Sequence, residues 1–521
     1  MKQFVLFMLA LVMQTTGTFV TSAEGTEKPT FTIMAPQTNY VRDLATNDYF
    51  LWVEEQTGVH IQWRTADEAV IGERVNLALT SRELPDAFLF CDLDNTQQMQ
   101  YGAEGVFVNL APYIESRGTY IKAAYEANDL MPGAITMPDG GIYALAGINT
   151  CYHCIYCGRA WINQTWLDNL NLSMPTTTQE LADVLRAFKE EDANGNGDPN
   201  DEIPFMACGD TWRASAYDYL MEAFTYNDFR DRMMMTDEGE VVFVANTEAW
   251  RNGLEYIRSL IVEELIDPAS LYQTAAECQV ISGGDVANVG VAPAMSYWTT
   301  LSNHLDQYVA MPPIEGPDGT RNAFVRQDTG YVNGQFAITS ACKDVETLFD
   351  WADFQFSDEA TYFSSWGIEG IGWSAPQEGD IGVNGEPALY RTYNVLSEGE
   401  VGNSSAPNIA LANRTAEFRL GQAVTGDDDS EYRLYIAAKE YARYASDNYL
   451  PALIYTEEEA SRIAILKTQV NDYVNEMTAA FLNGDIDIDD GWDAYVAEFD
   501  ALGLEEYLSI NQAAYDRVYE K

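Results

Sequence analysis

Short apolar runs and amphipathic segments alternate in the N-terminal part of the chain. Apolar residues fill 30–35, 59–63 and 84–90, and each run has the length and composition of a β-strand. The segments between them, 49–57 and 71–79, repeat apolar residues at helical spacing. Strands that alternate with helices in this way predict an α/β domain with a mostly parallel sheet and flanking helices.

Helical patterns dominate the C-terminal part. Thr456 is a good N-cap residue, and Glu459 three positions later completes a capping box. The helix that they open is predicted over 457–483, and it stops before Gly484, a residue type that favours helix ends. Further elements are predicted at 164–170, 179–189, 246–263, 335–338 and 343–356, with a last helix that runs to 518.

An oxygen-rich loop follows the predicted helix 179–189. Asp192, Asn194 and Asn196 alternate, with glycines after the last two. A hard divalent cation needs six to eight oxygens, and side chains at positions 1, 3 and 5 of a tight loop converge on one ion. We therefore predict a structural Ca²⁺ loop over 192–202, although such composition is also typical of a surface turn. The predicted ligands are Asp192, Asn194, Asn196, Asp198 through its main-chain carbonyl, Asp201 and Glu202.

Charge and composition exclude several classes of partner. The 521 residues include 29 Lys and Arg against 81 Asp and Glu, which gives a net charge of −52. Nucleic acid and anionic membrane surfaces are polyanions, so neither suits this chain as a partner. The acidic residues are spread along the sequence, as expected for a solvated surface. A hydrophobic content of 47% is ample for large cores, and the length suggests more than one domain.

The N-terminal stretch has the features of a secretory signal. Lys2 precedes the apolar run 4–13, and small residues at 21–23 suit a cleavage site. No later run is long and apolar enough to span a bilayer. We therefore predict that residues 1–23 are a signal peptide and that the protein is exported, to the periplasm or the outer face of the membrane.

Motifs in the middle and at the end of the chain resemble those of one protein family. The turn 139–141 leads into Ile-Tyr-Ala-Leu at 142–145, and the text W-L-D-N-L-N-L-S-M-P-T-T-T follows at 166–178. Together with the acidic loop and the C-terminal text, these motifs resemble the extracellular solute-binding proteins of ABC sugar importers. That family is maltose-binding-protein-like, and the resemblance is to its calcium-loop branch of alginate and aldouronate oligosaccharide binders. Ala146 stands where the family usually has proline, and the acidic loop is one residue longer than its common form.

The resemblance implies a two-lobe periplasmic-binding-protein type II-like fold with a helical C-terminal extension. The implied boundaries are 24–147 plus 333–375 for the first lobe and 148–332 plus 376–521 for the second, with the C-terminal helices at 457–518. It also implies a function without turnover. A monomer binds an oligosaccharide outside the cytoplasmic membrane and delivers it to the permease subunits of an ABC transporter. Relatives in Gram-positive bacteria usually carry a lipid-modified cysteine after the signal, but here the first cysteine is Cys91.

Candidate ligand contacts are aromatic and acidic residues near expected strand ends. Sugars present C–H faces to aromatic rings and hydroxyl edges to carboxylates, so a sugar cleft needs both types. Crevices in α/β sheets lie at strand C-termini, which places Asp92 and Asn95 near the ligand unless they only cap a loop. The alternative for the aromatic candidates is core packing, or a turn packed by its own side chains. The resemblance and these positions single out Trp298, Tyr297, Trp212, Trp366, Trp373, Glu369, Asp92 and Tyr331.

Three of the seven cysteines form a cluster in the sequence. Cys151, Cys154 and Cys157 stand three apart, and His153 lies among them. The spacing invites a zinc or iron–sulfur interpretation. In the related proteins this segment is a strand, where such steps alternate between faces and cannot converge on one ion. Half-buried free thiols or one local disulfide are therefore favoured. The other four cysteines are scattered and predict nothing.

Two other classes of function stay open. A polysaccharide hydrolase or lyase would also be rich in Asp, Glu and Trp, but a hydrolase needs two opposed carboxylates. The sequence shows no convincing acid–base pair and no match to a catalytic motif. A calcium-stabilised sugar sensor that feeds a signalling receptor would have the same binding features, so the sequence alone does not separate it from a transport protein.

Overall fold

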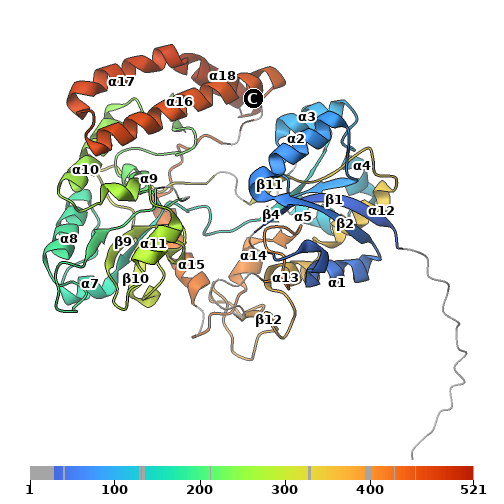
Figure 1. Cartoon of the computed structure of the whole chain (residues 1–521), viewed down its shortest axis with the longest axis horizontal. Helices are drawn as coiled ribbons and strands as arrows, with labels where there is room; N and C mark the ends of the chain where they lie inside the picture. Colours follow the sequence, from blue (N-terminus) through green and yellow to red (C-terminus); the bar gives the residue numbers. More distant parts are fainter. Residues whose placement is uncertain are drawn as a thin grey trace, which may run out of the picture.

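The chain folds into two lobes, each with its own β-sheet (Figure 1). This computed structural model describes residues 28–38, 41–127, 131, 135–209, 211, 213–326, 330–393, 402–426, 429–451, 453 and 455–519. The predicted signal peptide lies outside them. Within the described residues, no helix combines the length and the apolar composition that a bilayer crossing requires.

The first lobe holds a six-stranded sheet of order β14-β4-β11-β3-β1-β2. β3 is buried along its whole length and β11 over its last five residues, and apolar side chains of both strands pack into the core of the lobe. The strands are β1 (Thr30–Gln37), β2 (His60–Asp67), β3 (Ala87–Leu89), β4 (Leu145–Asn149), β11 (Tyr331–Ile338) and β14 (Asn413–Arg414). The helices are α1 (Asp48–Thr57), α2 (Ile71–Ser81), α3 (Asn95–Ala103), α4 (Ala111–Arg117), α5 (Tyr120–Glu126), α12 (Val345–Phe354) and α13 (Asp358–Trp366).

The sheet of the first lobe is mixed, whereas the alternating pattern predicted a mostly parallel one. β1, β2 and β3 are parallel, but β11 runs antiparallel to both of its neighbours, β3 and β4. The reason lies in the connectivity. β4 leaves this lobe for the second one, and β11 brings the chain back, so the two strands run in opposite directions along the same edge.

The second lobe holds a four-stranded sheet of order β10-β5-β9-β6. Only β6 and β9 are parallel, and β5 is antiparallel to β9 and β10. The strands are β5 (Ala160–Asn163), β6 (Ile203–Phe205), β9 (Val289–Pro293) and β10 (Tyr308–Met311), with a separate hairpin of β7 (Met233–Met235) and β8 (Val241–Phe243). The helices are α7 (Gln164–Asn169), α8 (Thr178–Glu190), α9 (Ala216–Met221), α10 (Glu248–Val262), α11 (Ala275–Ile281) and α15 (Ser430–Tyr441).

Three C-terminal helices lie across the second lobe (Figure 1). They are α16 (Glu457–Asn483), α17 (Ile488–Leu502) and α18 (Leu504–Tyr519), and α16 has the bounds and the capping box predicted from its sequence. Buried residues of α16 and α17, such as Val474 and Tyr495, share one core with Trp250 of α10. The helical extension is therefore part of the second lobe rather than an independent body.

One predicted lobe boundary is wrong. The segment 376–521 was assigned as a whole to the second lobe, but β14 pairs with β4 in the first sheet. Ala406, Ile409, Ala410 and Leu411 are likewise buried in the first lobe's core. The sequence shows no break there because β14 is only two residues long, and its position depends on pairing with a strand more than 250 positions away. β12 (Trp373–Ser374), β13 (Arg391–Thr392) and α14 (Ala416–Leu420) complete this region.

Three segments cross between the lobes. The first leads from β4 to β5, the second enters β11, and the third leads from β14 through α14 to α15. They contact one another: Asn149 N–H donates to Gly330 O at 2.6 Å, and Thr150 N–H donates to Arg414 O at 2.9 Å. The crossings therefore form one hydrogen-bonded bundle, which we call the hinge.

Candidate functional site

The edges of both sheets that lie next to the hinge face the opposite lobe. In the second lobe, Ala160 at the start of β5 pairs with Pro293 at the end of β9, so the carboxyl ends of β9 and of its parallel neighbour β6 lie where the first crossing enters. In the first lobe, β3 ends beside the hinge-side half of β11. Residues that follow β3, β6 and β9 are therefore the ones positioned between the lobes.

Asp92 lies at such an edge in the first lobe. It follows β3 with a φ of 49°, its side chain is exposed, and it accepts a hydrogen bond from Gln335 Nε2 at 3.1 Å. Asn95 is joined to β11 through Asn333, which donates to Asn95 Oδ1 at 2.9 Å. The loop-capping role is taken by Asp94, whose side chain accepts from Gln97 N–H at the start of α3. Asp92 therefore does not cap α3, and its exposed carboxylate lies at the hinge-side edge of the first sheet. Tyr331, half-buried, begins β11 at the same edge.

Trp298 is an exposed aromatic residue in the loop that follows β9 of the second lobe. It follows β9 and is 39% exposed, whereas its neighbour Tyr297 is only 4% exposed. The Tyr297 ring contacts Trp161 at 4.8 Å and Trp298 at 4.9 Å between centroids, and the Arg433 guanidinium lies 4.1 Å above it. The prediction that Tyr297 itself stacks on a ligand does not fit this geometry. Tyr297 instead packs edge-to-face against Trp298.

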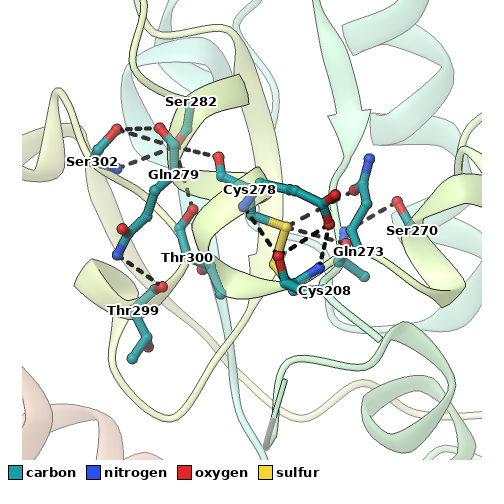
Figure 2. Close-up of a disulfide and its surroundings, with 12 residues drawn as sticks. Cys208, Ser270, Gln273, Cys278, Gln279, Ser282, Thr299, Thr300 and Ser302 are labelled. Atoms are coloured by element: carbon teal, nitrogen blue, oxygen red, sulfur yellow. Dashed lines mark hydrogen bonds between the residues drawn. A yellow bond between two sulfur atoms is a disulfide. The ribbon is translucent and has the colours of Figure 1, made fainter. Parts of the chain in front are cut away.

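The loop that carries Trp298 is held by α11 (Figure 2). Gln279 Nε2 donates to the carbonyls of Trp298 at 3.3 Å and Thr299 at 3.1 Å, and Ser302 Oγ donates to Gln279 O at 2.6 Å. α11 is in turn joined to the end of β6 by a disulfide between Cys208 and Cys278. The sequence did not reveal this pair, because 70 positions separate the two cysteines.

Arg213 is a second notable residue beyond the end of β6. Its side chain is 5% exposed and lies between the rings of Phe229 and Phe324, each 3.6 Å from the guanidinium carbon. Its Nε and Nη2 are buried without a hydrogen-bond partner among the described residues. It lines two cavities of about 240 and 460 Å³, which lie against the second crossing and against α16.

Two carboxyl groups, those of Glu222 and Asp218, interact electrostatically with Arg213. Burial raises the pKa of Glu222 well above its ordinary range, although Asn227 N–H and the Arg213 charge oppose the shift. Burial likewise raises the pKa of Asp218, against the charges of Arg213 and Arg232. No sequence motif links Arg213 to these acidic residues or to Phe229 and Phe324, so the cluster appears only in the folded chain.

The candidates at the end of α13 form an aromatic cluster of their own. Trp373 stacks on Tyr362 with centroids 4.6 Å apart and donates from Nε1 to Gly367 O at 3.0 Å. Trp366 lies near Tyr390, and Glu369 is exposed. One face of Trp373 is therefore used for packing, as the alternative of a self-packed turn predicts. Trp212, also a candidate, lies outside the described residues.

The acidic loop adopts the conformation that its glycines predict. Gly195 and Gly197 have φ values of 75° and 95°. Gly197 N–H donates to Asp192 Oδ2 at 2.9 Å, and Asn194 N–H donates to Glu202 Oε1 at 3.3 Å. The first and last acidic residues of the loop therefore both accept hydrogen bonds from main-chain N–H groups within it.

Two oxygens of this loop suit a cation. Asp192 Oδ1 and Glu202 Oε2 are buried and have no hydrogen-bond partner in the described part of the chain. Burial raises the pKa of Glu202, and the charges of Asp201 and Asp192 add to the shift, so the loop concentrates negative charge. Asp201 accepts from the amide groups of Asn194 and Asn196 at 3.0 and 2.6 Å. An oxygen-only donor set with two orphaned carboxylate oxygens fits a hard cation such as Ca²⁺.

The cysteine-rich segment is a series of turns in the first crossing, not the strand that the resemblance implied. Cys151 and Cys154 form a disulfide, which is one of the two alternatives favoured from the sequence. Cys157 is buried and unpaired, as are Cys91 and Cys342 in the first lobe. The segment cannot extend as a strand because it must turn from one sheet into the other, and the turns bring two cysteines within bonding distance.

Comparisons with known proteins relate the chain to substrate-binding proteins of ABC transporters. The chain is 29% identical over 479 residues to the fructooligosaccharide ABC transporter substrate-binding protein FusA of Streptococcus pneumoniae, covering 89% of this chain and 86% of FusA. It is 23% identical over 339 residues to a polygalacturonan/rhamnogalacturonan-binding protein of Bacillus subtilis, covering 63% of each chain. No family model matches the chain.

Solved structures show the same fold. The complex of FusA with kestose has a TM-score of 0.76 at 26% identity and covers 94% of this chain and 99% of FusA. An EF-hand mutant of FusA bound to fructo-nystose gives a TM-score of 0.75 at 26% identity, with the same coverage. A Bifidobacterium longum infantis solute-binding protein for human milk oligosaccharides has a TM-score of 0.77 at 22% identity, covers 94% and 99%, and supports the fold alone.

Proposed function

We propose that this chain, a homologue of the substrate-binding proteins of ABC transporters, binds an oligosaccharide between its two lobes and delivers it to a membrane permease. The relationship and the fold were predicted from the sequence motifs, and the comparisons confirm both. The observation that supports sugar binding most directly is Trp298. Its indole is exposed in the loop that follows β9, and the buried ring of Tyr297 packs against it.

The two lobes supply the two kinds of contact that a sugar needs. Trp298 offers an apolar face for the C–H side of a ring, and Asp92 offers a carboxylate for hydroxyl groups on the opposite lobe. A ligand that touches both residues can do so only when the lobes approach. Ligand binding would therefore favour a closed arrangement through motion at the hinge, and a permease would recognise that form.

We further propose that Ca²⁺ binds the loop 192–202. The side chains of Asp192, Asn194, Asn196, Asp201 and Glu202 and the carbonyl of Asp198 would hold it, and the two orphaned carboxylate oxygens support this assignment. The ion would bind in the second lobe, where Ala193 of the same loop is buried in the main core. The role of the ion would be structural. It would neutralise the loop carboxylates and stabilise the fold of the second lobe, and it would not contact the sugar.

Export and the absence of turnover complete the proposal. Residues 1–23 would direct the chain out of the cytoplasm, where it would act as a monomer that meets both sugar and permease. No bond of the sugar would be broken, since the relatives are binding proteins and the proposed cleft is built for contact with hydroxyl groups and ring faces.

Titration calorimetry tests the function. The mature protein would be titrated, in the presence of excess Ca²⁺, with neutral fructo- and xylo-oligosaccharides and with acidic uronate oligosaccharides. Short peptides serve as a control. At least one oligosaccharide should bind with one-to-one stoichiometry, and no new reducing ends should appear on long incubation. Binding of peptides alone, or release of reducing ends, would contradict the proposal.

A further inference from the structure

The first crossing contains a cluster of metal-ligating atoms that the proposed function does not use. One ligand atom each of Cys151, His153 and Cys154 lie within 4.8 Å of one another. Cys154 Sγ is 3.8 Å from His153 Nδ1. In the structure the two sulfurs form a disulfide, so the cluster is in its oxidised form. Cys154 is half-buried, which leaves one side of the cluster open to solvent.

A half-buried carboxylate lies beside the ring nitrogen of His153 that points away from Cys154. His153 Nε2 lies 3.0 Å from Glu431 Oε1 of α15, and Tyr152 donates its hydroxyl proton to the same oxygen at 3.3 Å. A carboxylate beside Nε2 favours the tautomer that carries the proton there. Nδ1 then keeps its lone pair, and Nδ1 is the atom that faces Cys154. Metal-binding histidines commonly have this arrangement, with a carboxylate on the far nitrogen.

We propose that reduction of the Cys151–Cys154 disulfide converts this cluster into a binding site for a borderline divalent cation of the Zn²⁺ class. The ligands are Cys151 Sγ, Cys154 Sγ and His153 Nδ1. Two sulfurs and an imidazole nitrogen select Zn²⁺ or Co²⁺ over Ca²⁺, whereas the oxygen-only loop 192–202 has the opposite preference.

The reduction needs a two-electron reductant of the thiol class. The first thiol attacks the S–S bond, releases one cysteine and forms a mixed disulfide with the other. The second thiol attacks this mixed disulfide and releases the second cysteine, so the two reductant sulfurs leave as a disulfide and each cysteine sulfur gains one proton. The cation then displaces both protons and binds the two thiolates. His153 contributes a neutral nitrogen and loses no proton.

The position of the cluster links it to lobe motion. Cys151 and Cys154 lie in the first crossing, whereas Glu431 belongs to α15, to which the third crossing leads. Arg159 strengthens the same contact, because its guanidinium donates to Leu434 O of α15 and to His153 O. The redox state of the disulfide in the first crossing therefore decides whether an ion binds His153, and His153 contacts α15, the helix that follows the third crossing. This consequence rests on the proposed function, but the metal site does not.

Cobalt(II) binding to the full mature chain tests the site. The protein is reduced with dithiothreitol, freed of reductant under nitrogen and titrated with Co²⁺ in excess Ca²⁺, which occupies oxygen sites. We expect one equivalent of Co²⁺ with a thiolate-to-cobalt charge-transfer band, which Zn²⁺ abolishes. The oxidised protein should show no band.

Variants assign the ligands. Cys154→Ser should abolish the band, and Glu431→Gln should weaken Co²⁺ binding by about ten- to a hundredfold, the usual effect of removing such a carboxylate. The double variant Cys208→Ser, Cys278→Ser is the matched control, since it removes the other disulfide and should keep the band. A reduced wild type without the band, or a Cys154→Ser variant that keeps it, would overturn the proposal. Far-ultraviolet circular dichroism checks that each variant is folded.

Discussion

Asn149 N–H donates to Gly330 O at 2.6 Å, and this bond joins the first crossing to the second. These two segments are so close that a Cβ atom on Gly330 would lie 2.4 Å from Thr150 Cα. Gly330 also has a φ of 93°, which side chains of L-residues rarely allow. The atoms nearest to such a Cβ belong to the main chain of Asn149 and Thr150, so no side chain could rotate away to make room for it. The hinge therefore requires glycine at this position.

Gly330→Ala should therefore destabilise the protein by about 2 to 5 kcal/mol, the sum of backbone strain and overpacking. Gly319 is the matched control, since its φ is 90° and a Cβ there would meet nothing within 4 Å in the described part of the chain. Gly319→Ala should cost only about 1 to 2 kcal/mol. Chemical denaturation of both variants measures the difference, and equal costs would contradict the close packing of the two crossings.

Removal of Ca²⁺ should lower the melting temperature. An ion present at a hundred times its dissociation constant contributes about 2.7 kcal/mol to the stability of the folded state. Asp192→Asn should abolish the difference between calcium-loaded and EDTA-treated protein in a thermal melt. Asp198→Asn is the control and should retain it, because Asp198 is expected to bind through its main-chain carbonyl. A wild type prepared free of calcium that gains nothing from the ion would refute the site.

Trp298→Ala should weaken oligosaccharide binding at least about tenfold, which corresponds to a loss of about 1.4 kcal/mol in binding free energy. Aromatic anchors at binding interfaces commonly contribute this much or more. The melting temperature should change little, because the side chain is 39% exposed. Tyr120→Ala, which removes an exposed ring on α5 of the first lobe, is the control and should leave affinity unchanged. Calorimetry gives both values. If the Trp298 variant binds as the wild type does, the proposed platform is wrong.

The two disulfides should differ in their effect on stability. In the loop-entropy description, a bridge across 70 positions stabilises by about 4 kcal/mol and one across 3 positions by about 1.5 kcal/mol. Replacing Cys208 and Cys278 by Ser should therefore cost more than replacing Cys151 and Cys154.

The longer bridge has a second role that separates it from the shorter one. Because Cys278 belongs to the helix that holds the Trp298 loop, its loss should also weaken sugar binding. Denaturant titration measures the stability difference, and calorimetry at a temperature where both variants are folded measures affinity. Equal stability losses would argue against the loop-length account.

Glu222 predicts a pH dependence of stability. Burial raises its pKa above the ordinary value of 4.5, so between that pH and the raised pKa the folded state binds a proton that the unfolded state has lost. This contribution to stability is complete below pH 4.5 and declines as the pH rises, by about 1.4 kcal/mol per pH unit in that window. Glu222→Gln should remove the decline and should therefore gain stability relative to wild type as the pH is raised.

Melting temperatures from pH 4.5 to 8 measure this difference. Glu238→Gln, in an exposed turn, is the control and should follow the wild-type curve. A Glu222→Gln variant whose advantage does not grow with pH would show that this carboxyl group does not titrate as its burial requires.

Local features were predictable from the sequence because neighbouring residues decide them. The capping box of Thr456 and Glu459 opens α16 where predicted, and Gly484 ends it in a left-handed conformation. The positive φ angles of Gly195 and Gly197 give the acidic loop its turns. The family motifs are also local text, so the relationship and the fold could be recognised before any contact was known.

The tertiary structure alone decided the contacts between distant segments. It joined Cys208 to Cys278, placed Phe324 against Arg213, packed Trp161 against Tyr297, and paired β14 with β4 in the sheet of the first lobe. Each of these depends on which sheet edge and which helix end come together when the lobes form. Residues 70 or more positions apart carry no spacing signal in a single sequence, and hydrophobic burial, which brings them together, acts on area and not on sequence order.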